Sequence, residues 1–193
     1  MNREIAALFA ITVGLGLAPS EIALACDYGA IPEPSPEVRL YATDLGLQFA
    51  IPQNYSIRSA WGYSRNGDYQ VRLEVVDPAT FAYDQCLVER GELLGERTPP
   101  LFTLRDLRLL KTAPGLGAAV QERYPWLMSN AAIEQVKGMQ VLTTYYQNDY
   151  QQSLVSVFWL VDGGDRLVWL EGLIEESVQA AAIERAIESM VID

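Results

Sequence analysis

The feature that most limits the fold of this chain is a pair of apolar segments joined by a tight turn in its last third. Residues 154–161 are apolar on both faces, as in a central strand of a sheet. The turn Asp162-Gly163-Gly164-Asp165 follows, and residues 166–174 return as a second apolar segment. Two such segments around a glycine-containing turn are typical of a β-hairpin. The sequence therefore predicts an antiparallel sheet that contains this hairpin.

Two-residue alternation of apolar and polar side chains predicts further strands, over residues 45–52, 57–63, 69–75 and 139–145. Helical spacing predicts helices over residues 78–90, 116–124 and from Glu175 onward, the first with Asp77 as its N-cap. Residues 95–114 show no clear pattern and include the basic residues Arg105, Arg108 and Lys111. Strands in adjacent runs with helices inserted between them predict an α+β fold, an antiparallel β-sheet faced by helices.

The N-terminal region has the pattern of an export signal. An apolar run over residues 5–17 is shorter than the roughly 20 residues that span a bilayer, and it precedes Ala23-Leu24-Ala25, a small-x-small cleavage pattern. A buried or amphipathic first helix is the alternative. The sequence predicts a signal peptide over residues 1–25, an extended proline-rich tether over 26–37 and one α+β domain over 38–193.

Two cysteines leave three interpretations open. Cys26 would become the first residue after cleavage, which makes it a candidate for lipid attachment as in bacterial lipoproteins. An exported chain with two cysteines also suggests a disulfide between Cys26 and Cys86. Cys86 lies on an apolar helical stripe, so a buried free thiol is the third interpretation.

Charge and composition exclude several function classes. Asp and Glu outnumber Lys and Arg by 25 to 14, so phosphate backbones and anionic lipid heads are repelled and no nucleic-acid partner is expected. Histidine is absent, which removes the commonest general base and metal ligand. The turn of residues 162–165 is explained by the hairpin without calcium. We assign no catalytic, metal or cofactor-binding residue from the sequence.

Two aromatic groups are candidates for a protein interface. Trp61, Tyr63 and Tyr69 lie with Arg58, Arg65 and Arg72 on paired strands, and Trp, Tyr and Arg dominate interface hot spots. The alternative is that these aromatic side chains face the core while the arginines face water. Tyr145, Tyr146 and Tyr150 belong to a hairpin connection rich in Tyr, Asn and Gln, which suits adaptable contacts. An ordinary polar loop is the alternative there.

The order of elements resembles that of PsbP-like proteins. The resemblance lies in the opening strand of residues 45–55, in the strand that ends at Asp77-Pro78, in the late hairpin and in the closing helix through Ile187-Glu188-Ser189-Met190. It implies an α/β/α sandwich and a binding role outside the cytoplasm, since PsbP-like proteins are extrinsic subunits or assembly helpers of photosystem II. Metal sites proposed in that family use histidine, which this chain lacks.

Three functions follow as hypotheses. The first is a non-enzymatic accessory protein of the periplasm or thylakoid lumen that binds a protein partner, such as a membrane complex, and touches the membrane only through a lipid anchor on Cys26. The second is a small-ligand carrier, which predicts an apolar pocket of several hundred Å³. The third is a histidine-free hydrolase, which predicts a cleft with two carboxyl groups about 5–10 Å apart.

Overall fold

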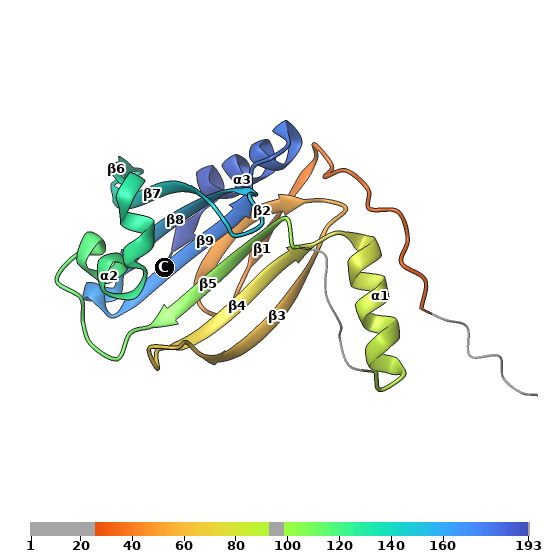
Figure 1. Cartoon of the computed structure of the whole chain (residues 1–193), viewed down its shortest axis with the longest axis horizontal. Coiled ribbons are helices and arrows are strands. Elements are labelled where there is room, and N and C mark those ends of the chain that lie inside the picture. The colour runs from red at the N-terminus through yellow and green to blue at the C-terminus, as the bar shows by residue number, and fades with distance from the viewer. Residues whose placement is uncertain (1–25, 93–98, 193) are drawn as a thin grey trace, which may run out of the picture.

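A computed structural model describes residues 26–92 and 99–192, so the predicted signal peptide lies outside the described residues. Its main feature is a seven-stranded antiparallel sheet in the order β3-β4-β5-β9-β8-β7-β6 (Figure 1). These strands are β3 (Ser56–Tyr63), β4 (Tyr69–Val76), β5 (Phe102–Arg108), β6 (Ala132–Val136), β7 (Met139–Gln147), β8 (Ser153–Val161) and β9 (Arg166–Leu173). A second antiparallel sheet joins β1 (Val38–Ala42), β2 (Leu47–Pro52) and β10 (Val191–Ile192).

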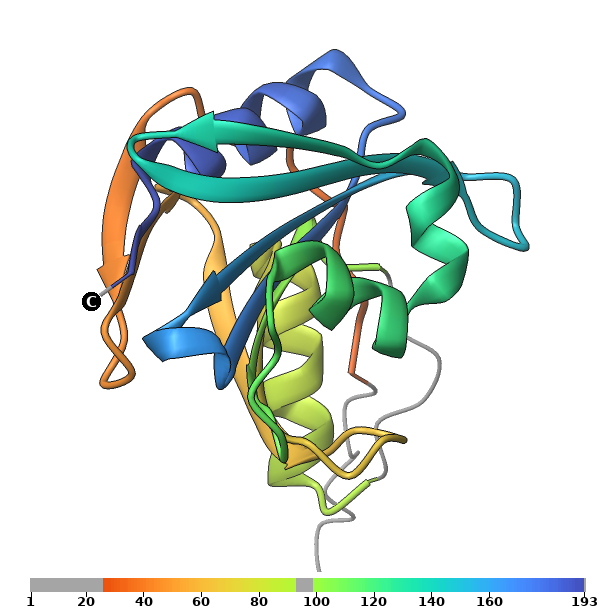
Figure 2. The same cartoon turned by 90° about the vertical axis from the view of Figure 1, so that its left-hand side faces the viewer.

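Both faces of the large sheet are covered. The small sheet and α3 (Ser177–Ser189) lie on one face, which we call the core face, and enclose the larger apolar cluster (Figure 2). On the opposite face, which we call the helical face, α2 (Leu116–Arg123) and the 3-10 helix η1 (Pro125–Asn130) pack over β7 and β8, whereas α1 (Pro78–Glu89) lies over β3 and β4. The predicted α+β fold, an antiparallel sheet with helices packed on it, is confirmed.

The hairpin predicted over residues 154–174 is confirmed as β8 and β9, with Leu154 opposite Leu173 and Val161 opposite Arg166. The turn between them contains a short 3-10 helix, η2 (Asp162–Gly164). Gly164 has a φ of 101°, and a Cβ there would lie 2.4 Å from the Ala113 carbonyl oxygen. A side chain at this position is therefore excluded by both backbone conformation and space.

The helix predicted over residues 78–90 is confirmed as α1. The side chain of Asp77 caps it by accepting a hydrogen bond from the Thr80 amide at 2.9 Å, and Pro78 occupies the first turn. This arrangement satisfies an amide that would otherwise have no partner at the start of the helix. The end of β4 and the start of α1 are thereby fixed relative to one another.

The sequence predicts no element over residues 95–114, and one strand there was missed. Residues 102–108 form β5, a strand in the middle of the large sheet, paired with β4 and β9. The apolar and polar residues of β5 do not alternate clearly, because the buried residue Asp106 lies on the core face where an apolar residue would be expected. Its carboxylate accepts hydrogen bonds from Arg166 at 3.0 and 2.8 Å, which makes burial tolerable.

Candidate functional site

The first aromatic group lies at the turn end of the β3–β4 hairpin. Trp61, Tyr63 and Tyr69 are on the core face, but they lie beyond the apolar core and are 78%, 73% and 38% exposed. The rings of Tyr63 and Tyr69 meet edge to face with their centroids 5.7 Å apart. We call these three residues the aromatic patch. The two-residue alternation explains why these side chains lie on the core face. They are exposed because the apolar core does not extend as far as this end of the hairpin.

The second group is divided between the two faces. Tyr145 is exposed on the core face, whereas its neighbour Tyr146 lies on the helical face and donates to Glu171 at 2.6 Å. Burial, followed by the charge of Glu171, raises the pKa of Tyr146 well above its ordinary value. Tyr150 projects from the β7–β8 connection and lines a hollow of about 680 Å³ beside Glu171. The three tyrosines therefore do not form one surface.

A pocket of about 310 Å³ opens on the helical face between the β3–β4 turn and η1. We call it the arginine pocket, and its lining residues are Ser64, Arg65, Asn66, Gln70, Arg105, Arg123, Tyr124, Trp126 and Trp169. Three of the nine are arginines and none is Asp or Glu. Of these nine, only Arg65 was among the interface residues predicted from the sequence.

The aromatic wall of the arginine pocket is packed in a chain. Tyr124 contacts Trp169 with ring centroids 4.6 Å apart and Trp126 at 5.7 Å, and Trp169 stacks on Phe158 at 5.2 Å. The guanidinium of Arg105 lies 4.1 Å from the centre of the Trp169 ring, a cation–π contact. Trp126 is 64% exposed at the rim. The pocket thus combines fixed aromatic surface with positive charge.

A buried ion pair holds the β3–β4 turn in place. Asp68 is 1% exposed and accepts hydrogen bonds from the Leu110 amide at 3.0 Å and from Nε of Arg123 at 2.8 Å. The charged hydrogen bond to Asp68 raises the pKa of Arg123 against the opposing effect of burial. Because the pair ties the turn to α2, Arg65 and the aromatic patch stand on a rigid support.

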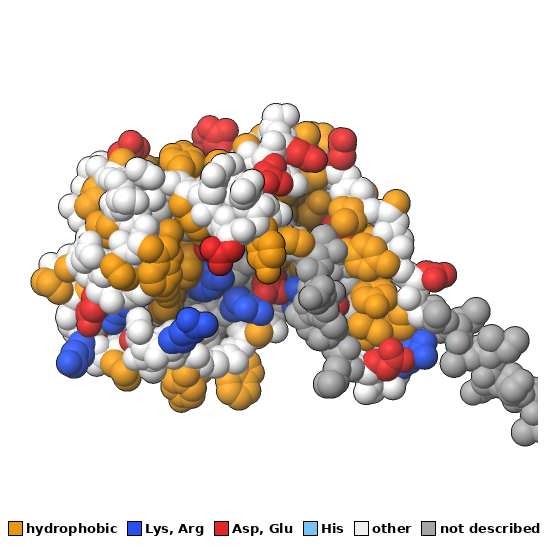
Figure 3. Space-filling model, in the orientation of Figure 1, with side chains coloured by type: hydrophobic (Ala, Val, Ile, Leu, Met, Phe, Trp, Pro, Cys, Tyr) orange, Lys and Arg blue, Asp and Glu red, His pale blue; other side chains and the backbone are white. Residues whose placement is uncertain are grey.

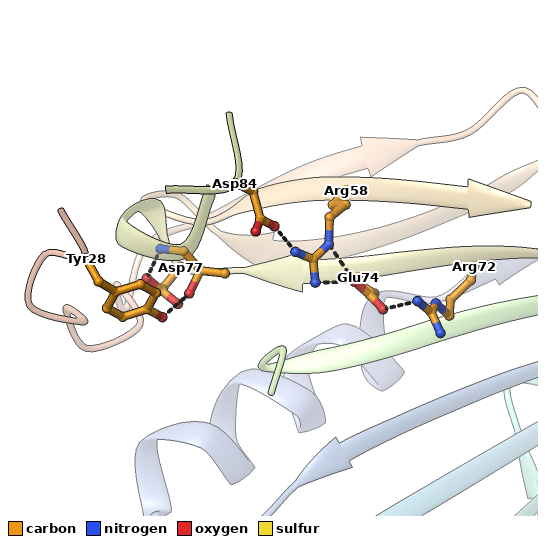
Figure 4. Close-up of polar contacts among 7 residues, drawn as sticks. Tyr28, Arg58, Arg72, Glu74, Asp77 and Asp84 are labelled. Atoms are coloured by element: carbon orange, nitrogen blue, oxygen red, sulfur yellow. Dashed lines mark hydrogen bonds and ion pairs between the residues drawn. The ribbon is translucent and has the colours of Figure 1, made fainter. Parts of the chain in front are cut away.

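A second pocket, of about 490 Å³, lies between α1 and the strands β3 and β4. We call it the helix pocket. Its base is a row of alternating charges, Asp84–Arg58–Glu74–Arg72, in which Nε of Arg58 donates to Glu74 at 2.6 Å and Arg72 reaches Glu74 at 2.8 Å (Figure 4). The apolar side chains of Ala60, Phe81 and Val88 also line it.

The charges of the helix pocket form a structural network. Its two deeper carboxylates, those of Glu74 and Asp84, are both paired with Arg58, an arrangement that fixes α1 on the sheet. In the described part of the chain, no group of three Cys, Asp or Glu residues is placed to hold a metal ion.

The N-terminal end of the described chain is fastened to α1. Cys26 and Cys86 form a disulfide with their Cα atoms 5.9 Å apart. Tyr28, which lies beside Asp77 at the start of α1 (Figure 4), shares a hydrogen bond with the Thr80 hydroxyl. Its ring also contacts the Tyr83 ring edge to face, with the centroids 5.3 Å apart. A cysteine in a disulfide cannot also carry a thioether-linked lipid. Of the three interpretations of the two cysteines, the structure shows the disulfide. Among the described residues, no helix has the length and apolar content to cross a membrane.

Sequence reasoning missed the arginine pocket because its residues come from four separate segments. Residues 64–70, Arg105, residues 123–126 and Trp169 are far apart in the chain, and the topology of the sheet brings them together. The one available signal was Pro125-Trp126, a large apolar residue just after a helix end, where a solvated side chain would be expected to be polar.

Comparisons with known proteins found structural similarity alone. No family model and no curated protein sequence matches the chain. The structure is similar to cyanobacterial PsbP (CyanoP) from Synechocystis sp. PCC 6803, with a TM-score of 0.48 and 14% identity over 86% of this chain and 96% of that chain. A protein of Bacteroides thetaiotaomicron VPI-5482 gives a TM-score of 0.43 at 8% identity, over 80% of this chain and 48% of that chain, so this chain spans about half its length. The first of these is a PsbP protein, the kind of protein that the sequence resembles.

Proposed function

We propose that this chain is a non-enzymatic extracytoplasmic domain that binds another protein as an accessory factor. The observation that carries the proposal is the aromatic patch, in which Trp61 and Tyr63 expose most of their surface on a rigid hairpin. Exposure of large aromatic side chains to water is unfavourable, and covering them with a partner would gain the free energy of burying their apolar surface. Trp and Tyr are also the residues that contribute most to binding at protein interfaces.

The location outside the cytoplasm is supported by the disulfide between Cys26 and Cys86. Disulfides persist in oxidising compartments and are rare in the cytosol. A signal peptide over residues 1–25 agrees with this location and stays a prediction. The sequence resemblance to PsbP-like proteins makes photosystem II the first membrane complex to test as a partner.

The test is capture of a partner by zero-length crosslinking of the tagged full chain to membranes of its host. The double variant Trp61→Ser/Tyr63→Ser removes the centre of the aromatic patch. We expect it to lower recovery of the crosslinked partner at least about tenfold, because hot-spot aromatics each contribute about 2 kcal/mol or more. Leu40→Ser is the matched control, since Leu40 is an exposed apolar residue on β1. Equal recovery by the double variant and by the control would contradict the proposal.

A small-ligand carrier is the second candidate, and the helix pocket favours it. At about 490 Å³, with Ala60, Phe81 and Val88 in its lining, it has the size of ordinary ligand sites. Ala60→Trp fills this pocket and leaves the aromatic patch unchanged. A carrier would then lose its bound ligand in native mass spectra of protein purified from its host, whereas a partner-binding domain would keep its crosslinked partner.

A further inference from the structure

We propose that the arginine pocket binds an acidic segment of a protein partner. This inference rests on the proposed function and names the chemistry of what is bound. It starts from charge: the chain carries a formal net charge of −11, yet the arginine pocket is lined by three arginines and by no acidic residue. Figure 3 shows Lys and Arg side chains gathered in the middle of the helical face beside large hydrophobic side chains.

Two of the three arginines have donors available for a ligand. Arg123 is buried and bonded to Asp68, to Glu122 and to the Ala119 carbonyl, so it serves the fold. Arg65 is exposed, and it has no hydrogen bond or ion pair with any residue that the structure describes. Arg105 reaches a single oxygen of Glu171 with both terminal nitrogens at 3.4 Å, well beyond the roughly 2.7–2.9 Å of a strong charged hydrogen bond.

Glu171 is a weak partner for Arg105 because it has another one. Its second oxygen accepts a hydrogen bond from the Tyr146 hydroxyl at 2.6 Å. This bond is shorter and stronger than the contact of Glu171 with Arg105. The guanidinium of Arg105 is held instead by its stacking on Trp169. A guanidinium that stacks on a ring through its face has its N–H edge directed outward, where it can donate two parallel hydrogen bonds to a carboxylate.

The surroundings favour a peptide over a free anion. Trp126 is exposed at the rim and offers apolar contact to a side chain next to the acidic one. The turn that carries Arg65 has Tyr63 and Tyr69 at its base on the other face, so one partner can cover the aromatic patch and reach the pocket around the same turn. A long polyanion such as nucleic acid is disfavoured by the net charge of the chain.

The experiment titrates the full chain with the peptide GDELDEG and, separately, with its neutral counterpart GNQLNQG, while following the indole N–H resonance of Trp126 by NMR. We expect a saturable shift with the acidic peptide that weakens between 50 and 500 mM salt, because salt screens the attraction between opposite charges. The neutral peptide should bind at least about tenfold more weakly.

Charge-reversal variants test which arginines bind the acidic peptide. Arg65→Glu and Arg105→Glu should each lower the affinity for GDELDEG at least about tenfold. Arg39→Glu makes the same change in net charge on β1, outside the pocket, and should change the affinity less than about twofold. Arg65 lies in an exposed turn, so its variant remains informative even if Arg105→Glu does not fold.

Three results of the titrations would overturn the inference: equal binding of both peptides, equal loss in the Arg39 and Arg65 variants, or saturation of the same resonance by citrate at the affinity of the peptide. The last would assign the pocket to a small anion. An Arg65→Glu chain that still recovers the crosslinked partner, where the Trp61/Tyr63 variant does not, would remove this inference and leave the proposed function in place.

Discussion

The buried pair of Arg166 and Asp106 gives a sharp test of how this fold is held together. Arg166 is 1% exposed, and its Nε and Nη2 atoms donate to the two oxygens of Asp106 at 3.0 and 2.8 Å. Nη2 also donates to the Leu45 carbonyl at 2.6 Å, which links the large sheet to the loop before β2. Asp106→Ala removes the carboxylate and leaves the guanidinium buried without it.

Removing one partner of a buried ion pair costs about 3–5 kcal/mol, because a buried charge loses the carboxylate that paired with it. With a urea m-value of about 2 kcal/mol/M for a domain of this size, the unfolding midpoint of Asp106→Ala should fall by about 1.5–2.5 M. The total stability of such a domain is about 5–15 kcal/mol, so the variant should remain folded in buffer. Equilibrium urea unfolding followed by tryptophan fluorescence measures the shift.

The double variant Asp106→Leu/Arg166→Met separates charge from packing. Both replacements are apolar and of similar bulk, so no charge is left buried, although the Leu45 carbonyl loses a donor at a cost of about 1 kcal/mol. We expect the double variant to be more stable than Asp106→Ala. The reasoning is refuted if Asp106→Ala costs less than about 1 kcal/mol at an unchanged m-value, or if the double variant is the less stable of the two.

Three further predictions concern stability. Cys86→Ser should lower the free energy of unfolding by about 4 kcal/mol, since the disulfide closes a loop with a sequence separation of 60; intact mass with and without reductant checks that the bond is present. Burial raises the pKa of Tyr55 to about 12, so between pH 10 and 12 unfolding releases a proton and stability falls as the pH rises; Tyr55→Phe should flatten this slope in urea titrations. Gly172→Ala should lower the thermal midpoint, because its Cβ would lie 2.4 Å from Ile183 Cδ1.

Much of the fold was predictable because local patterns and tertiary packing agree in it. The β8–β9 hairpin is apolar enough for a central position, and α1 carries its own cap at Asp77. The edge strand β6 was missed because all its residues but Val136 are exposed, so no apolar alternation marks it. The exposure of Trp61 and Tyr63 was also beyond pattern reasoning, since alternation gives the face of a strand and not the point where its cover ends.

The strand β5, which was not predicted from the sequence, also contributes Arg105 to the arginine pocket. Arg105 and Asp106 are neighbours in β5, so their side chains point to opposite faces of the sheet. Asp106 is tolerated in the core only because Arg166 on β9 pairs with it, and Arg105 is tolerated on the helical face only because Trp169, on the same strand β9, stacks beneath it. Asp106 breaks the alternation that would have identified β5, and both charged residues find their partners 60 or more residues away. A sequence pattern has no access to such partners, which is why the strand and the arginine pocket were missed together.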